Sequence, residues 1–223
     1  VKMKNSEIKT IAPSILGVDI SNITDLMTGL NQSKAQWLHL DVMDGVFVPN
    51  LTFGAMVIKS MRKHSNLFFD AHLMMQQPEN VFNAMADAGV DLITVHYEAC
   101  KDLNSTLKKI KDLNIKAGIA ISPNTDVNVL APYLNSIDHF LVMSVEPGLG
   151  GQKFIENSYS KVDYLATKRE SSNLDFTISV DGGVDFTNIE KLSRMGANVL
   201  VAGGAVFKND DYIESISKLN SLI

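Results

Sequence analysis

Three of the apolar runs in this chain end in polar side chains that could bind a metal. His39 and Asp41 stand two residues apart in one run, His72 lies at the matching point of the next, and Asp181 ends a third. Residues i and i+2 of a strand point the same way, so His39 and Asp41 share a face. Two imidazoles and two carboxylates at the carboxyl ends of strands suit a divalent metal such as Zn²⁺, Fe²⁺, Mn²⁺ or Co²⁺. The alternative is that each is an isolated polar residue at a strand end.

Glycine-rich segments follow three successive apolar runs near the end of the chain. Glycine lets the backbone approach a phosphate closely, and the exposed N–H groups then surround the anion. A tight turn explains any one of these segments, whereas three in succession favour a phosphate site and a small phosphorylated metabolite as substrate. The glycines concerned are Gly148, Gly150, Gly151, Gly182, Gly183, Gly203 and Gly204.

Strand-like and helix-like segments alternate along the whole sequence, and they must position these groups. Apolar, β-rich runs occupy residues 11–16, 37–43, 68–74, 92–96, 117–121, 140–145, 176–180 and 199–201. Nearly continuous hydrophobicity is typical of buried parallel strands, and apolar residues at helical spacing lie between most runs. Eight such units in one domain over 1–223 predict a (β/α)8 TIM barrel, with an open doubly wound sheet as the alternative. We expect residues 1–9 to be a flexible extension.

The composition limits the kinds of partner that we expect for this protein. The chain has 223 residues and a formal net charge of -5, with no stripe of lysine and arginine, which argues against nucleic acid. One cysteine excludes an internal disulfide and fits a reducing compartment. No apolar run approaches the ~20 residues of a membrane span, and the first ten residues lack the apolar core of a signal peptide. We therefore expect a cytoplasmic protein with no membrane partner.

Short motifs along nearly the whole chain give a more specific indication. They are APSIL (12–16), HLDVMDG (39–45), FVPNLT (47–52), HLM (72–74), HYE (96–98), MSV (143–145), PGLGGQ (147–152) and VDGG (180–183). In this order they resemble the ribulose-phosphate 3-epimerase family of the pentose phosphate pathway. The resemblance implies a TIM barrel of the ribulose-phosphate binding type, and a homo-oligomer.

The same resemblance assigns roles to residues. It implies that His39, Asp41, His72 and Asp181 hold one divalent metal ion and that Asp41 and Asp181 are the acid/base pair. Ser14 and His72 are expected to contact the substrate, together with the glycines above. Met43, Met74 and Met143 are expected to line the reaction centre, although ordinary barrel core would also explain methionines there.

The implied reaction inverts C3 of D-ribulose 5-phosphate to give D-xylulose 5-phosphate through an enediolate. It removes a proton next to a carbonyl and returns one on the opposite face, so it needs two acid/base groups and no nicotinamide, flavin or pyridoxal cofactor. One alternative is epimerisation of a six-carbon ketose phosphate such as D-allulose 6-phosphate. Another is a non-catalytic sugar-phosphate-binding barrel, which we would expect to lack one of the two carboxylates. A Schiff-base aldolase is disfavoured, because Lys116 precedes its strand and Lys153 lies in a loop.

Three positions depart from the family pattern. Gly204 stands where serine is usual, Tyr97 where proline is usual, and Glu146 where a smaller polar residue is more familiar. The change at Gly204 removes a hydroxyl that commonly contacts phosphate. None of the three touches the predicted metal ligands.

Overall fold

A ring of parallel strands forms the centre of the molecule. The computed structural model describes residues 4–209 and 211–223, and in them eight strands pair side by side in the order β1-β8-β7-β6-β5-β4-β3-β2. A bridge between Ser14 and His39 joins the two end strands, so the ring closes. The strands are β1 (Thr10–Pro13), β2 (Trp37–Met43), β3 (Phe68–Met74), β4 (Leu92–His96), β5 (Lys116–Ile121), β6 (His139–Met143), β7 (Thr177–Asp181) and β8 (Val199–Ala202).

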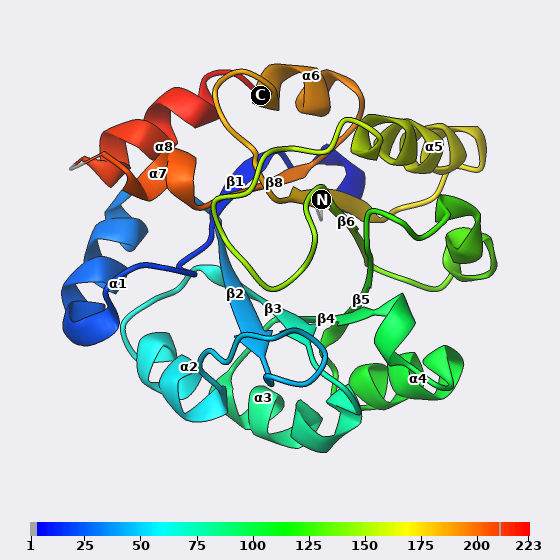
Figure 1. Cartoon of the computed structure of the whole chain (residues 1–223), viewed down its shortest axis with the longest axis horizontal. Helices are drawn as coiled ribbons and strands as arrows, with labels where there is room; N and C mark the ends of the chain where they lie inside the picture. Colours follow the sequence, from blue (N-terminus) through cyan, green and yellow to red (C-terminus); the bar gives the residue numbers. More distant parts are fainter. Residues whose placement is uncertain (1–3, 210) are drawn as a thin grey trace.

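Helices surround this ring, as Figure 1 shows. The α-helices are α1 (Ile23–Gln32), α2 (Ala55–Arg62), α3 (Phe82–Ala88), α4 (Leu103–Asp112), α5 (Ser158–Ser171), α6 (Ile189–Arg194), α7 (Gly204–Phe207) and α8 (Tyr212–Asn220). The short 3-10 helices are η1 (Asn5–Glu7), η2 (Ile20–Asn22), η3 (Pro78–Val81), η4 (Tyr97–Ala99) and η5 (Val127–Tyr133). The predicted (β/α)8 barrel is confirmed, and the alternative of an open doubly wound sheet is wrong.

The strands are buried on both faces, which explains their continuous hydrophobicity. In β2 every residue is buried. Leu38 and Leu40 belong to the large apolar core that also includes Met27 of α1, so they face the helices. His39 and Asp41 alternate with them and point into the barrel. One strand therefore supplies both the core and the polar groups of the site.

The segment before β1 makes specific contacts with the rest of the barrel. The first three residues of the predicted flexible extension over 1–9 lie outside the described residues. The η1 turn (Asn5–Glu7) donates two hydrogen bonds of 3.1 Å to Asp175, and the Lys9 ammonium donates to the Ser193 carbonyl over 2.8 Å. These contacts join Asn5, Ser6 and Lys9 to the barrel, and the flexible extension over 1–9 stays a prediction.

A buried histidine occupies the amino-terminal part of the barrel. His139, the first residue of β6, is 1% exposed, and its Nδ1 lies 2.6 Å from Thr177 Oγ1. Its Nε2 has no hydrogen-bond partner among the described residues. Burial lowers the pKa of His139 to about 4, so this imidazole is neutral in the folded protein at neutral pH.

We expect His139 to make the protein sensitive to acid. Between its unfolded pKa of 6.5 and its folded pKa of about 4, the unfolded chain binds a proton that the folded protein does not. The free energy of unfolding should therefore fall as the pH drops through this window, by about 1.4 kcal/mol per pH unit. Urea titrations at several pH values should show a shallower pH dependence for His139→Gln. Equal dependence in both proteins would contradict this assignment.

Candidate active site

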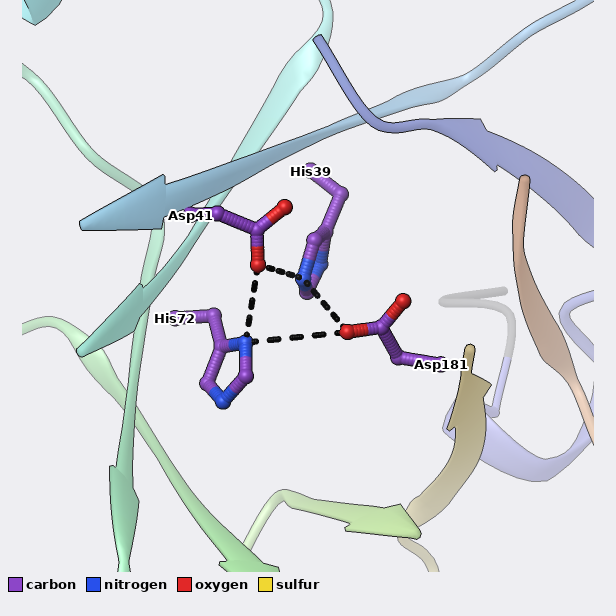
Figure 2. Close-up of side chains that lie close together, drawn as sticks. All are labelled: His39, Asp41, His72 and Asp181. Carbon is purple, nitrogen blue, oxygen red and sulfur yellow. Dashed lines mark hydrogen bonds and ion pairs between the residues drawn. The ribbon is translucent and has the colours of Figure 1, made fainter. Parts of the chain in front are cut away.

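Four side chains converge at the carboxyl ends of β2, β3 and β7 (Figure 2). His39, Asp41, His72 and Asp181 each offer one ligand atom, and these atoms all lie within 4.8 Å of one another. Asp41 Oδ1 is 3.3 Å from His39 Nε2 and 3.1 Å from His72 Nδ1. Asp181 Oδ2 is 3.7 and 3.8 Å from the same two nitrogens. The structure therefore brings together all four residues that the sequence predicted as a metal-binding set.

Strand register accounts for this convergence. In the parallel pair of β2 and β3, His39 stands opposite Asp70 and Asp41 opposite His72. Alternate residues face inward, so one pair of strands delivers both imidazoles and one carboxylate to the barrel interior. Asp181, the last residue of β7, reaches the same point from beyond β1 and β8.

The donor set fits a divalent metal ion. His39 Nδ1 lies 2.8 Å from Asp70 Oδ2, a contact in which the ring donates to the carboxylate and turns Nε2 toward the cluster. That Nε2 is buried and has no hydrogen-bond partner among the described residues. A carboxylate behind a histidine fixes its orientation and makes it a better ligand, as is usual in metal sites. The residues present could therefore hold a metal, with Asp70 supporting His39.

Negative charge is divided unequally between the two carboxyl groups of the cluster, Asp41 and Asp181. Burial alone would raise the pKa of Asp41, but His39 and His72 beside it hold that pKa well below its usual range. Burial and the Asp41 carboxylate raise the pKa of Asp181 to about 7. At neutral pH one carboxyl is thus fully ionised and the other titrates, a division typical of an acid/base pair.

The pKa values of the two imidazoles also shift in opposite directions. Burial opposes protonation of His39, but the carboxylates of Asp41 and Asp70 outweigh it and raise the pKa of His39 well above 6.5. Burial lowers the pKa of His72 to about 4. A metal entering this site must displace the His39 proton, so its binding releases protons.

Ser14 and the three methionines lie around the cluster. Ser14 Oγ donates a 2.7 Å hydrogen bond to Asp41 Oδ2, a contact that the sequence did not indicate. Met43 and Met74 are buried against each other and Val48, at the register position two residues beyond Asp41 and His72. Met143 stands opposite Asp181 in the β6–β7 register. Their predicted contacts with substrate remain predictions.

The glycine-rich loops border the same end of the barrel. The loop between β6 and α5 crosses the view in front of the barrel opening (Figure 1). It lies directly on the loop after β2, because a Cβ on Gly148 would come within 2.8 Å of Val48 Cβ. Gly150 faces Leu16 and Gly203 faces Ser14, both in the segment that leaves β1. These loops therefore border the side of the opening formed by β7, β8 and β1.

The two glycines that follow β7 need their backbone freedom. Gly182 and Gly183 have φ angles of +114° and +63°, in the left-handed region that favours glycine. A Cβ on Gly183 would also lie 2.6 Å from the backbone nitrogen of Phe154. The turn after β7 is thus closely packed against the loop that precedes α5.

Three further side chains join the site, and none of them was predicted from the sequence. Asp70 supports His39, and its position two residues before His72 on the same strand face was the available signal. His96 and Glu98 extend the hydrogen bonds of His72 away from the cluster. They belong to a motif that contributed to the family resemblance, but nothing in their spacing showed what they would contact.

A closed parallel α/β barrel with a His/Asp donor set at its carboxyl end defines a barrel enzyme with a site suited to a divalent metal. Comparison with known proteins narrows the class. Residues 10–207 match the sequence model of the ribulose-phosphate 3 epimerase family, and the chain belongs to this family. It is therefore an isomerase of the epimerase type, as predicted.

Among the described residues, none of the helices combines the length and the apolar character that crossing a bilayer requires.

Individual relatives agree over nearly their whole lengths. The chain is 38% identical to a ribulose-phosphate 3-epimerase of Bacillus subtilis, over 94% of this chain and 97% of the relative. It is 44% identical to one of Candida glabrata, over 93% of this chain and 89% of the relative. A crystal structure of 3-hexulose-6-phosphate synthase superposes with a TM-score of 0.68 at 18% identity, covering 97% of this chain and 99% of the other, which shows the shared fold alone.

Proposed function

We propose that this chain interconverts D-ribulose 5-phosphate and D-xylulose 5-phosphate, with Asp41 and Asp181 as its acid/base pair. The observation that carries the proposal is the approach of two carboxylates to one point from β2 and from β7, between the two imidazoles. Inversion at a carbon requires proton transfer on both faces of a flat intermediate. Two groups delivered from different parts of the barrel wall can supply it.

The chemistry follows from the acidity of C3–H, which lies next to the C2 carbonyl. One aspartate takes this proton as a general base, and the substrate becomes an enediolate that is planar at C3. The other aspartate, carrying a proton, donates it to the opposite face of C3. In the reverse direction the two residues exchange roles. The division of charge between Asp41 and Asp181 supplies one ionised and one proton-bearing carboxyl near neutral pH.

We propose that His39, Asp41, His72 and Asp181 hold a divalent metal ion when the enzyme is active. Bound there, it would supply Lewis-acid stabilisation of the negative charge on the substrate oxygens. The donor set suits Zn²⁺, Fe²⁺, Mn²⁺ or Co²⁺. Met43, Met74 and Met143 would shield the intermediate from water, since they place polarisable, apolar side chains around the site.

Direct assay of the purified chain with a divalent metal tests this function. We expect D-ribulose 5-phosphate to be converted to D-xylulose 5-phosphate with a higher kcat/KM than D-allulose 6-phosphate is epimerised. A preference for the six-carbon sugar would overturn the substrate assignment, but the proposed C3 epimerisation by two aspartates would still stand. Binding of either sugar phosphate without turnover would favour the non-catalytic barrel.

We further propose that backbone N–H groups of the glycine-rich loops bind the substrate phosphate. The candidate donors lie on the loops after β6, β7 and β8, at Gly148, Gly150, Gly151, Gly182, Gly183, Gly203 and Gly204. Barrels of this type commonly bind phosphate near the loops after their last two strands.

We also propose that the protein forms a homo-oligomer and is located in the cytoplasm. Light scattering on the purified protein tests the oligomeric state.

Gly203→Val is expected to raise KM for the phosphorylated sugar at least tenfold, which is about 1.4 kcal/mol of binding if KM follows affinity. The position suits the test because a Cβ there would meet Ser14 O at 3.5 Å, an ordinary contact. Gly183 is unsuitable for this test, because a side chain there would clash with the backbone of Phe154. Metal affinity, measured by dye competition, should be unchanged. Unaltered KM would place the phosphate elsewhere.

Gly204→Ser restores the hydroxyl that is usual in the family. A Cβ at Gly204 would lie 3.2 Å from the flexible end of Lys208, so the substitution should be accommodated. We expect KM to be unchanged or to fall modestly, since one added neutral hydrogen bond contributes about 0.5–1.5 kcal/mol. A rise of more than tenfold in a folded variant would contradict phosphate binding at this loop.

A further inference from the structure

The motif formed by His96, Tyr97 and Glu98 has no role in the reaction described so far, yet it connects directly to the site. His96 ends β4, is 0% exposed, and places its Nε2 2.8 Å from His72 Nε2. The two rings are stacked, with centroids 5.0 Å apart. Because His72 Nδ1 faces Asp41 and Asp181, its Nε2 is the side of the ring that contacts His96.

Glu98 continues this chain of contacts to the protein backbone. His96 Nδ1 lies 3.2 Å from Glu98 Oε2, while Glu98 Oε1 accepts from the Ser122 N–H over 2.8 Å and from the Thr125 hydroxyl. Burial opposes ionisation of Glu98, but these hydrogen bonds outweigh it and lower its pKa to about 2. Glu98 is thus an ionised group that accepts hydrogen bonds at both oxygens.

This arrangement limits where the protons lie. An ionised carboxylate has no hydrogen to donate, so His96 must carry its proton on Nδ1 and donate to Glu98. A hydrogen bond between two imidazole nitrogens needs one donor. A metal held at His72 Nδ1 would use the lone pair of that nitrogen, so His72 would carry its proton on Nε2 and donate it to His96 Nε2. The lone pair of His72 is left on Nδ1, which faces the cluster.

We propose that His96 and Glu98 are positioning residues that hold His72 in its Nε2–H tautomer, ready to bind a metal through Nδ1. Asp70 does the same for His39 through a single hydrogen bond, and His72 receives its support through two. The inference rests on the proposed role of His72 as a metal ligand. Neither His96 nor Glu98 contacts the reacting atoms in this assignment.

Glu98→Gln tests the direction of the hydrogen bonds with little change in shape. The Ser122 N–H and the Thr125 hydroxyl both donate, so they should hold the amide oxygen of the variant on their side. Its NH₂ group then faces His96 Nδ1, which becomes an acceptor. His96 would donate from Nε2, and His72 would be left with its proton on Nδ1. We expect the Kd for Zn²⁺ to rise about 10–100-fold, the usual effect of losing such support.

A second variant separates this role from a structural one. In His96→Gln the amide oxygen can still accept from His72 Nε2–H, but the connection to Glu98 is broken. Adding Glu98→Gln to it should then change the Zn²⁺ Kd less than twofold. Thr125→Val, which disturbs the same carboxylate without reversing the hydrogen bonds, should also stay within twofold of wild type. If Glu98→Gln acted by loosening the loop, it would weaken binding equally in both backgrounds.

Nitrogen NMR of the Zn²⁺-loaded, ¹⁵N-histidine-labelled protein gives an independent readout. The His72 shifts should report Nδ1 as the metal-bound nitrogen and Nε2 as protonated. Either of two results would overturn the inference: the opposite His72 tautomer, or a Zn²⁺ Kd for Glu98→Gln equal to that of the wild type. If the wild type is active as an epimerase, both results leave the proposed function intact. Absence of epimerase activity in the metal-loaded wild type would instead overturn the proposed function, whatever the ratio of Kd values.

Discussion

Asp41→Asn and Asp181→Asn are each expected to lower kcat for C3 epimerisation by about 10²–10⁴-fold, the usual contribution of a positioned acid or base. An amide has nearly the same shape as the carboxyl group but cannot carry the proton. Both substitutions also remove an anionic metal ligand. Circular dichroism and thermal unfolding should show that each variant keeps the barrel, because the apolar core between strands and helices does not include either side chain.

Solvent isotope exchange separates the two carboxyl groups. Each variant retains one acid/base residue, so it should still exchange the C3 hydrogen of one epimer with D₂O while failing to convert it to the other. Asp41→Asn and Asp181→Asn should differ in which epimer exchanges. The measurement is made at saturating metal, with metal content confirmed for each sample, so that loss of the ion is not mistaken for loss of the base. Near-normal kcat in either variant with metal bound would overturn the two-base assignment.

Most of the barrel could be predicted because the strands are long, apolar and clearly separated. β2 (Trp37–Met43), β3 (Phe68–Met74) and β4 (Leu92–His96) begin and end where the sequence indicated. The first strand is shorter than expected and ends at Pro13, although the Ser14 N–H still donates to the Ala202 carbonyl over 3.1 Å and Ser14 forms a bridge with His39. Proline has no N–H to continue a ladder, so the apolar residues that follow it belong to a loop.

The short helices could not be predicted in the same way. α6 has six residues and α7 has four, too few turns for an apolar repeat to stand out from the neighbouring loops. η5 carries Pro132 within it, and it occupies the position where the alternating pattern leads one to expect an α-helix. Tertiary packing, rather than local periodicity, determines these segments.

The four ligand residues could be predicted because strand geometry decides where they point. His39 and Asp41 share a face by their spacing, and the carboxyl ends of parallel strands meet at one end of a barrel. The supporting residues depend on relations between strands that spacing does not give. Asp70 supports His39 through the register of β2 with β3. Glu98 lies in η4, and its contacts come from the loop after β5.

Removal of the metal is the second large effect that we expect. Treatment with a chelator should lower kcat by about 10²–10³-fold, since Lewis-acid stabilisation contributes several kcal/mol and each 1.4 kcal/mol changes a rate tenfold. Addition of Zn²⁺, Fe²⁺, Mn²⁺ or Co²⁺ should restore turnover, and the relative kcat values would identify which ions the site accepts. The chelator must be removed before the assay, so that it does not itself bind the substrate.

Substitution of the ligands shows whether the effect of the chelator arises at this site. The double variant His39→Ala, His72→Ala removes both imidazoles and keeps both carboxylates, so it should lose tight binding of Zn²⁺ in a dye-competition titration and should not recover activity when metal is added. His139→Gln is the matched control, because it changes another buried histidine of the barrel interior that lies outside the cluster. Full activity in rigorously metal-free wild type, or in the double variant, would mean that Asp41 and Asp181 perform the epimerisation without a metal.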